Sequence, residues 1–394
     1  MVRWYGLMAR PLGADDGIAV AFILAVLASD TIAHPPIQAV LTSDEEIGML
    51  GARDLDTSEL TAKRLINIDS ESEGILYVSC AGGVRAECDI PVAYEDAADW
   101  VADGASDVQN GQVCFEVKIS GLAGGHSGVE IHKQHTNAIR LLASLLSHAS
   151  GAADFRLVSF SGGGKENAIP KEAKAVVSVR SCNATTFEQS IKESADVWMQ
   201  EISATEPHAK IEIEKTDIAA DKVLDSKSTA NVIYALWLSP DGVYKMSQEI
   251  KGMVQTSLNL GTAYLDADKL VYKYLIRSNT AAGKKLLLER VTTFVKHLSG
   301  KVVTMSDYPA WEYKSDSQLR KICVDSFTNV YGHEPEVTSI HAGLECGILA
   351  GKMPGVDMIS FGPTLESVHT PDECMNVASV ERTWEYLMEI LKSL

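Results

Sequence analysis

Hydrophobic positions along the chain predict an alternation of helices and short strands. The run from Gly17 to Ser29 is rich in alanine and has almost no polar residue, which predicts a buried helix that ends near two prolines. The apolar run Ile37 to Thr42 predicts a strand, and Arg64 to Asp69 predicts a second one after an intervening helix. Because both strands end in acidic residues, this β-α-β order predicts an open α/β sheet whose carboxyl edge holds a ligand.

The pattern changes at about Ala86, where a second, α+β unit is predicted to begin. Alternating, half-buried strands and amphipathic helices follow in the order β-α-β-β-α-β, which is typical of an antiparallel sheet with helices on one face. The predicted strands lie at 113–120, 155–160, 173–180, 209–215, 254–260, 269–278 and 301–305, and the predicted helices at 135–149, 186–203, 229–238 and 281–297.

The α/β pattern returns after the segment Tyr308 to Trp311. A helix is predicted at 317–330, a strand at 356–361 and a terminal helix after Ser379. We therefore expect one α/β domain that is interrupted by the α+β insert. The predicted bounds are 1–85 for the first part of that domain, 86–304 for the insert and 305–394 for the second part.

Composition and charge narrow the classes of protein that fit. With 394 residues, 46% of them hydrophobic, the chain is long enough to bury a large core. Its formal net charge of -18 argues against binding to nucleic acid or to an anionic membrane surface. Seven cysteines without a CxxC pair indicate thiols in a reducing compartment, and no segment resembles a signal peptide or a membrane span. We expect a soluble, cytoplasmic protein whose partners are metal cations and small substrates.

Acidic side chains and one histidine occur where the predicted elements begin or end. Asp15 and Asp16 precede the first helix, Asp44 to Glu46 follow a strand, Asp69 ends another, and His369 follows the strand at 356–361. Carboxylates a few Å apart repel one another and raise one another's pKa unless a cation lies among them. Carboxylates and an imidazole suit Zn²⁺ or a similar ion, and a further carboxylate can act as general base on the attacking water.

Each of these features, taken alone, also has a purely structural explanation. The helix macrodipole favours an acidic triplet at a helix N-terminus, and Asp15 and Asp16 are ordinary helix caps. His369 on its own is an ordinary loop histidine. The glycine-rich stretch SGGGKENA misses the GxxxxGK[ST] spacing of a phosphate loop, so it predicts a glycine turn. The order of the acidic groups at strand ends favours the metal site.

Eight ordered blocks of sequence resemble one known family. The blocks are PLGADDGIAVAFILAVLAS, LTSDEEIGMLGA, NIDSESEG, CAGG, GGHSGVEIHK, NAIP, HAGLECGIL and FGPTLESVHTPDE. They resemble the aminoacyl-histidine dipeptidases, which cleave carnosine-like Xaa-His peptides and belong to the co-catalytic di-zinc aminopeptidase and carboxypeptidase superfamily. The resemblance runs from about Leu12 to the C-terminus.

The resemblance implies a fold, an activity and an assembly. The fold is a zinc-peptidase catalytic domain with a mixed, mostly parallel sheet and helices on both faces, interrupted by an α+β lid domain. The implied activity is metal-dependent hydrolysis of dipeptides that carry a C-terminal histidine. Two zinc sites are implied, with Mn or Co as alternatives, and a homodimer can form through the lid.

The metal ligands and the general base follow from the matching blocks. Asp15 of the GADDG block would bridge the two metals, and Glu46 and His369 would complete one site. Asp69 would be a ligand of the other site. Glu45 would be the general base that takes a proton from the attacking water and passes it to the leaving amine.

The lid residues follow in the same way. His126 of GGHSG resembles the residue that stabilises the tetrahedral oxyanion. Asn167 of NAIP and Arg277 of LIRS resemble the groups that hold the substrate carboxylate, which a guanidinium can bind through two hydrogen bonds. The structural alternatives are a turn histidine at 126 and a surface ion pair at 277. His341 and Glu345 are expected near the pocket without an assigned role.

One family feature does not occur in this sequence. The family carries an HxD segment before GADDG, whereas only fourteen residues precede Asp15 here and the first histidine is His34. About the first hundred residues of a full-length enzyme are expected to be missing. We therefore expect one site with three protein ligands, one weaker site formed by Asp15 and Asp69, and slower hydrolysis. We also expect exposed sheet edges.

Two further functions remain as alternatives. The first is a catalytically inactive homologue that retains lid-mediated dimerisation or peptide binding. The second is Mg²⁺-dependent phosphoryl transfer at the acidic cluster, which the lack of a nucleotide loop in the sequence disfavours.

Overall fold

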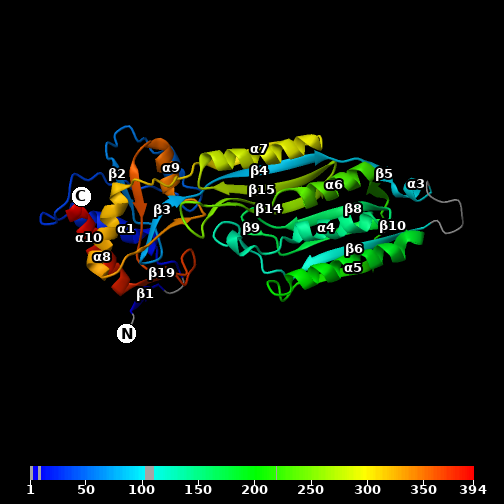
Figure 1. The fold of residues 1–394 in the computed structure, drawn as a ribbon, viewed down its shortest axis with the longest axis horizontal. Helices are drawn as coiled ribbons and strands as arrows, with labels where there is room; N and C mark the ends of the chain where they lie inside the picture. The colour runs from blue at the N-terminus through cyan, green and yellow to red at the C-terminus, as the bar shows by residue number, and fades with distance from the viewer. Residues whose placement is uncertain (1–2, 8–9, 103–110, 219) are drawn as a thin grey trace.

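The molecule consists of two lobes, a smaller and a longer one, which lie end to end along its long axis (Figure 1). The computed structural model describes residues 3–7, 10–102, 111–218 and 220–394. Both ends of the chain lie in the smaller lobe, and the middle of the chain forms the longer one (Figure 1).

A mixed four-stranded sheet forms the centre of the smaller lobe. Its strand order is β17 (Glu336–Ile340), β3 (Ile75–Cys80), β18 (Asp357–Ser360) and β2 (Arg64–Asn67). β17 pairs with β3 and β18 pairs with β2 in parallel, whereas β18 and β3 are antiparallel. The predicted α/β class with a mixed sheet is therefore confirmed.

Helices cover both faces of this sheet because its strand residues alternate between two apolar clusters. Leu76 and Val78 pack in the cluster of α1 (Ala14–Leu27), α8 (Gln318–Tyr331) and α10 (Val377–Ser393). Tyr77 and Cys80 pack in the opposite cluster with α9 (Glu345–Lys352). Residues that alternate along a strand point to opposite faces, which explains why Leu76 and Val78 are separated from Tyr77. The pairing of β3 with β17 shifts register between Tyr77 and Cys80, and Cys80 packs in the same cluster as Tyr77.

The predicted strand at Ile37 to Thr42 is wrong. This segment forms no strand, and no hydrogen bond between described residues reaches its backbone. Its side chains are half-buried or exposed, and Leu41 is 56% exposed. A strand requires a neighbouring strand to pair its N–H and C=O groups, and the described residues place none beside this segment.

The first helix forms as predicted, although it is not buried on all sides. Ala19, Phe22 and Val26 face the core, where the ring of Phe22 lies 5.3 Å from that of Trp384. The opposite face exposes apolar side chains, with Leu24 57% exposed. A helix that is apolar on every face buries only the side that packs against another element. Among the described residues, no element packs against the side of α1 that carries Leu24.

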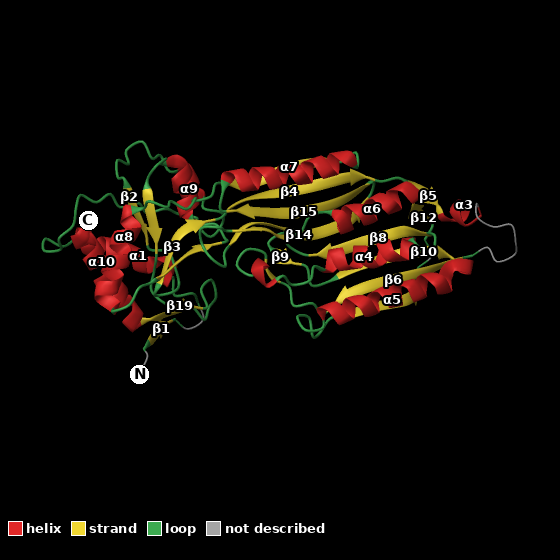
Figure 2. Ribbon diagram, in the orientation of Figure 1, coloured by secondary structure: helices red, strands yellow, loops and turns green. Residues whose placement is uncertain are grey.

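The longer lobe contains an antiparallel sheet of nine strands with helices on one face (Figure 2). The helices are α4 (Ala138–Ser150), α5 (Ala184–Ile202), α6 (Ser226–Leu238) and α7 (Ala281–His297). The strand order is β11 (Lys210–Thr216), β6 (Gln112–Ser120), β10 (Ala173–Arg180), β8 (Phe155–Gly163), β14 (Val254–Asp266), β15 (Lys269–Ser278), β4 (Gly82–Pro91) and β16 (Lys301–Tyr308), with β13 (Gly242–Met246) beside β14.

The core of the longer lobe lies between this sheet and its helices. Along α4, Leu141, Leu142, Leu145 and Leu146 are fully buried at helical spacing. Burial of a leucine side chain contributes about 1.5–3 kcal/mol to the stability of the fold. The leucines on this face of α4 therefore provide much of the free energy that holds the helix against the sheet. The side chain of Asn137 begins the helix by accepting hydrogen bonds from two backbone N–H groups.

Shorter elements complete the fold. They are β1 (Trp4–Gly6), β20 (Cys374–Asn376) and β19 (Leu365–Glu366) in one sheet, β12 (Lys222–Leu224) with β5 (Tyr94–Asp96), β7 (Gly125–His126) with β9 (Ala168–Ile169), and the helices α2 (Leu50–Asp54) and α3 (Ala97–Ala102). Within the described residues, no helix combines the length and apolar composition that a membrane crossing requires. The domain bounds 1–85, 86–304 and 305–394 stay a prediction.

Candidate active site

The start of α1 is built around a carboxylate that lies far away in the sequence. Glu373 accepts hydrogen bonds from the backbone N–H groups of Gly13, Ala14 and Asp15 at 2.8, 2.8 and 3.2 Å. A negative charge is favourable at a helix N-terminus, where backbone N–H groups lack partners. Asp15 and Asp16 keep non-helical backbone angles, so the helix proper follows them. Glu373 thereby fixes the backbone that carries Asp15.

Glu46 and His369 lie on loops that contain unusual backbone angles. The loop from Asp44 to Met49 has a φ of 57° at each end and closes through a 2.7 Å hydrogen bond from Met49 N–H to Glu45 C=O. His369 has a φ of 63°. Left-handed angles at non-glycine residues cost about 1–3 kcal/mol each and occur preferentially at functional sites.

The side chains of Asp15, Glu46 and His369 converge. Each offers one donor atom within 4.8 Å of the others. His369 Nε2 lies 3.0 Å from Asp15 Oδ2 and 2.7 Å from Glu46 Oε1. Donor atoms around a tetrahedral zinc ion lie about 3.3 Å apart, so only small shifts are needed to admit one. Asp15 is 13% exposed and His369 57%, which leaves the group open to solvent on one side. These residues fit a divalent cation.

Four more carboxylates beside this group have raised pKa values: Asp16, Asp69, Glu45 and Glu71. Burial raises the pKa of Asp16 to about 9, with additional repulsion from Asp69 and Asp15. Burial raises the pKa of Asp69 to about 8, with repulsion from Asp15, Glu45 and Glu345. Without a cation, these groups therefore hold protons that exposed carboxylates lose.

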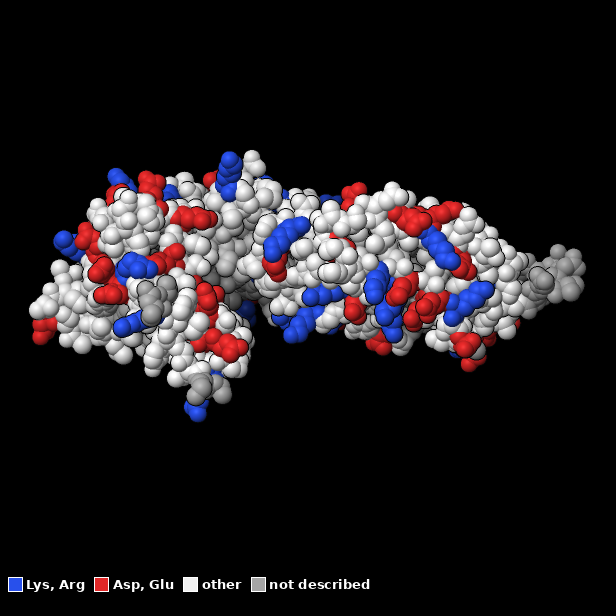
Figure 3. Space-filling model, turned by 90° about the horizontal axis from the view of Figure 1, so that it is seen from below, with Lys and Arg blue, Asp and Glu red and all other residues white. Residues whose placement is uncertain are grey.

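Glu45 has a pKa of about 7, raised by burial and then by Glu46 and Glu345. Burial alone would lower the pKa of His369, but Glu46 and Asp15 raise it overall. Acidic side chains gather on the smaller lobe near its junction with the longer one (Figure 3). The centre is thus strongly electronegative and suited to a cation.

Asp69 does not join the three converging side chains. Within the described residues, the group whose donor atoms lie within 4.8 Å of one another contains Asp15, Glu46 and His369 only. The charges of Asp15 and Glu45 nevertheless raise the pKa of Asp69, so its carboxylate lies within electrostatic range. Its role as a ligand of a second metal stays a prediction.

His126 lies on β7, which pairs with β9 next to Asn167. His126 Nδ1 accepts hydrogen bonds from the N–H groups of Gly128 and Val129 at 3.3 and 3.2 Å. Burial and the charge of Arg277 lower the pKa of His126, so the ring is neutral with its proton on Nε2. Asn167 holds this turn through its backbone C=O, which accepts the Ser127 N–H at 2.9 Å, while its side chain is exposed.

Arg277 is not a surface ion pair. It is 6% exposed, and its Nη1 donates to the hydroxyl of Tyr308 at 3.0 Å. Its Nε has no hydrogen-bond partner in the part of the chain that the structure describes. The ion pairs found among the described residues do not include it. A buried guanidinium with open donors is suited to bind an anion.

His341, which the sequence left without an assigned role, and Tyr308, which it did not single out, belong to this region. His341 is 4% exposed and lies 2.7 Å from Ser257 Oγ through Nε2 and 3.1 Å from Asn279 Oδ1 through Nδ1. Burial and then the charge of Arg277 lower the pKa of His341 to about 3. Tyr308 had no signal in the sequence beyond its place where the α/β pattern returns. Its ring packs in one apolar cluster with Met49, which connects Arg277 to the loop of Glu46.

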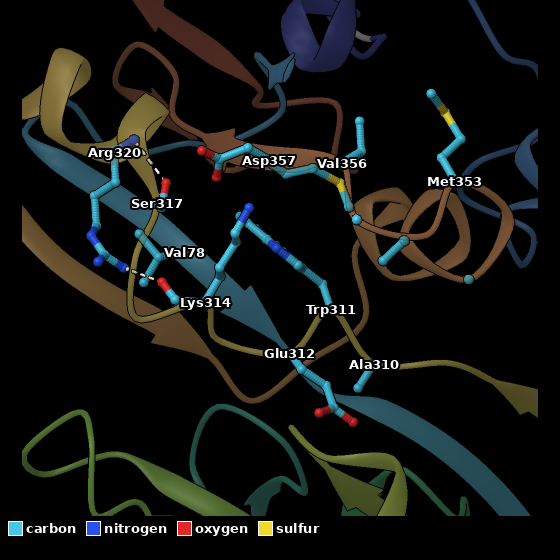
Figure 4. A pocket seen from close by; sticks show the side chains of 14 residues that line it. Val78, Ala310, Trp311, Glu312, Lys314, Ser317, Arg320, Met353, Val356 and Asp357 are labelled. Atoms are coloured by element: carbon cyan, nitrogen blue, oxygen red, sulfur yellow. Dashed lines mark hydrogen bonds between the residues drawn. The ribbon is translucent and has the colours of Figure 1, made fainter. Parts of the chain in front are cut away.

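A cavity of about 260 Å³ lies elsewhere in the smaller lobe, lined by Trp311, Arg320 and Asp357 among others (Figure 4). None of the predicted site residues lines it. Arg320 donates to the backbone C=O groups of Lys314 and Ser315, and Asp357 accepts the N–H of Leu319. The side chains of Arg320 and Asp357 therefore have structural partners.

The site combines carboxylate and imidazole donors with a further carboxylate, and it lies in a lobe built on a mixed α/β sheet. This combination is typical of metal-dependent hydrolases. The model of Peptidase family M20/M25/M40 matches residues 12–393, and the chain belongs to that family.

Two known proteins are similar to the whole chain. The cytosol non-specific dipeptidase of Escherichia coli K12 is 34% identical over 393 residues, which cover 100% of this chain and 78% of that protein. The crystal structure of aminoacylhistidine dipeptidase from Vibrio alginolyticus superposes with a TM-score of 0.91 at 34% identity, covering 100% of this chain and 79% of the other. The resemblance found in the sequence is confirmed: the chain is a homologue of these dipeptidases and a peptide-bond hydrolase of metallopeptidase type.

Proposed function

We propose that this chain is a metal-dependent dipeptidase that hydrolyses Xaa-His dipeptides, with Glu45 as general base. The convergence of Asp15, Glu46 and His369, with Glu45 in the adjoining sequence, is the observation that carries the proposal. The kinship with an aminoacylhistidine dipeptidase supports the substrate class.

Asp15, Glu46 and His369 would hold a divalent cation, for which zinc fits the oxygen and nitrogen donors and Mn or Co are alternatives. Bound there, such an ion supplies a Lewis acid that makes water easier to deprotonate. Asp69 would contribute to a second, weaker site. The pKa of Glu45, about 7, suits a group that must take up a proton and release it again near neutral pH.

The groups of the longer lobe would act on the peptide. His126 would donate its Nε2 proton to the oxyanion that forms as water attacks the carbonyl carbon. Arg277 would bind the C-terminal carboxylate with its open N–H groups, assisted by Asn167. In this proposal, residues 86–304 form a lid over a catalytic domain that consists of residues 1–85 and 305–394. Dimerisation through the lid and a cytoplasmic location complete the proposal.

A hydrolysis assay tests this function. Cleavage of β-alanyl-histidine in the presence of Zn²⁺ or Mn²⁺ is compared for the parent chain, Glu45→Gln and the exposed-site control Glu366→Gln. Loss of a general base is expected to lower kcat by about 10²–10⁴-fold, whereas the control keeps its activity. Equal rates for the parent and Glu45→Gln would contradict the proposal. A folded, metal-loaded parent that binds the dipeptide without cleaving it would favour the inactive, peptide-binding homologue.

A further inference from the structure

Four residues form a row across adjacent strands where the longer lobe meets the smaller one. Ser257 on β14 lies opposite Arg277 on β15. Arg277 lies opposite Gly83 on β4, and Gly83 lies opposite Tyr308 on β16. Residues that lie opposite each other in antiparallel strands project from the same face of the sheet. The side chains of Arg277 and Tyr308 therefore share a face, with a glycine between them.

Gly83 leaves room for a contact between side chains that are two strands apart. Neighbouring strands are separated by about 4.8 Å, so Arg277 and Tyr308 start roughly 10 Å from each other. A Cβ at Gly83 would lie 2.4 Å from the hydroxyl oxygen of Tyr308, so the tyrosine leans over the glycine. A Cβ at Gly343 would lie 2.9 Å from the ring on its other edge. The two glycines define the slot that holds the ring of Tyr308.

The hydroxyl of Tyr308 binds one side of the guanidinium, and the Nε side has no hydrogen-bond partner among the described residues. Nη1 of Arg277 donates to Tyr308 at 3.0 Å, whereas Nε has no partner in the described part of the chain. The edge formed by Nε and Nη2 presents two parallel N–H groups, which is the geometry that a carboxylate accepts. Burying a charged donor without a partner costs several kcal/mol, so this edge is arranged for an anionic ligand.

Among the described residues, no carboxylate forms an ion pair with Arg277. His126 and His341 both have lowered pKa values, in each case through burial and then the charge of Arg277. His341 is held by Ser257 and Asn279, which are neutral groups. The hydrogen bond found for the guanidinium is therefore with a neutral group, the hydroxyl of Tyr308, and no ion pair among the described residues offsets its charge.

We propose that Tyr308 is a positioning residue that orients Arg277 toward the C-terminal carboxylate of the substrate, and that Gly83 is the residue that permits this contact. Together they set the preference for free dipeptides over amidated ones. The inference rests on the proposed function, in which Arg277 binds that carboxylate. Tyr308 acts through Arg277 and needs no contact with the substrate.

Calorimetric binding measurements test the proposal without requiring turnover. The parent for these measurements is Zn²⁺-loaded Glu45→Gln, and the ligands are β-alanyl-histidine and its C-terminal amide. Tyr308→Phe is expected to weaken binding of the free dipeptide about tenfold, the equivalent of about 1.4 kcal/mol, and to leave binding of the amide unchanged. Tyr386→Phe is the matched control, because it removes a buried hydroxyl that donates to the backbone of Cys323 instead.

Gly83→Ala is a second, independent variant. Its added Cβ displaces the ring of Tyr308, so it is expected to weaken binding of the free dipeptide as Tyr308→Phe does, and the double variant should be no weaker than either one. In the chain with Glu45 intact, Tyr308→Phe should raise KM and leave kcat within about twofold, as expected for loss of uniform binding.

The failures of the two proposals are distinguishable. If Arg277→Met leaves the ratio of the two affinities unchanged, or if the parent binds neither ligand, the carboxylate role of Arg277 is wrong. If Arg277→Met abolishes the preference for the free dipeptide while Tyr308→Phe retains it, Tyr308 does not position Arg277. If Tyr308→Phe weakens the binding of both ligands equally, the role of Tyr308 is structural only.

Discussion

At the scale of single residues, the main feature is the crowding of carboxylates around Asp15. Asp16, Asp69 and Glu45 have raised pKa values of about 9, 8 and 7 because they are partly buried and repel one another. A bound cation reverses this balance, since it favours the ionised form of every neighbouring carboxylate. Protonation, metal affinity and stability are therefore linked in this protein.

Metal affinity should increase with pH. At pH 6 the folded, metal-free site retains protons on Glu45, Asp69 and Asp16, and a cation must displace them. The apparent Kd for Zn²⁺ should therefore fall between pH 6 and pH 8. Calorimetry in buffers of different ionisation enthalpy should show proton release that shrinks over the same interval. A pH-independent Kd without proton release would contradict this expectation.

In the absence of metal, the free energy of unfolding should decrease as pH rises. The folded pKa values of Asp16 and Asp69 exceed the unfolded values, so the folded state binds more protons between about pH 4 and pH 9. Stability must then fall as pH rises through that window. Thermal unfolding in a chelator should show a Tm that decreases from pH 5 to pH 8, whereas excess Zn²⁺ should restore it.

Asp16→Asn tests the cause of that decrease. The amide keeps the size of the side chain and cannot ionise, so folding no longer requires the uptake of a proton at this position. The chelated variant should be more stable than the parent at pH 8, by about 1 kcal/mol or more, and equally stable at pH 4. Glu366→Gln, at an exposed position, should leave the pH profile of the Tm unaltered.

At the scale of elements, α1 differs between its two faces. Phe22 is 6% exposed and packs against Trp384, whereas Leu24 is 57% exposed. Phe22→Ala should lower the free energy of unfolding by about 3–5 kcal/mol, because it removes a buried ring and leaves a cavity. Leu24→Lys should change it by less than about 0.5 kcal/mol. Urea unfolding measures both, and a large loss from Leu24→Lys would show that this face is covered.

Sequence patterns correctly predicted the helices and strands that are determined by local sequence periodicity. The helix at 281–297 and the strands at 173–180 and 269–278 begin and end where their periodicity does. The strand predicted at 37–42 failed because pairing requires a neighbour that no local pattern specifies. In the site, ordered motifs pointed to Asp15, Glu46 and His369. Tyr308 escaped notice because its contact with Arg277 depends on the register of three strands.

At the scale of the whole molecule, the smaller lobe carries a concentration of exposed apolar side chains near the start of the chain. They include Val20, Leu24, Leu27, Leu41, Ile47 and Leu50. Contiguous apolar surface promotes association between molecules. We expect the purified chain to form assemblies larger than the proposed lid-mediated dimer at micromolar concentration, and Leu24→Lys with Leu27→Lys to reduce the sedimentation coefficient of these assemblies.

A matched control separates this effect from added charge alone. Leu286 on α7 is 64% exposed in the longer lobe, so Leu286→Lys adds a similar charge away from the apolar surface. It should leave the sedimentation profile unchanged. If Leu286→Lys disperses the assemblies and the α1 double variant does not, association proceeds through the longer lobe.

The convergence of Asp15, Glu46 and His369 on one divalent ion is tested most directly by a Co²⁺ titration monitored by visible absorption. We predict one tightly bound ion per chain, with d–d bands typical of low coordination number, and an affinity at least about 100-fold weaker in His369→Ala. Glu366→Gln should bind as the parent does. Co²⁺ binding of undiminished affinity in His369→Ala would contradict the metal centre on which the proposed hydrolysis depends.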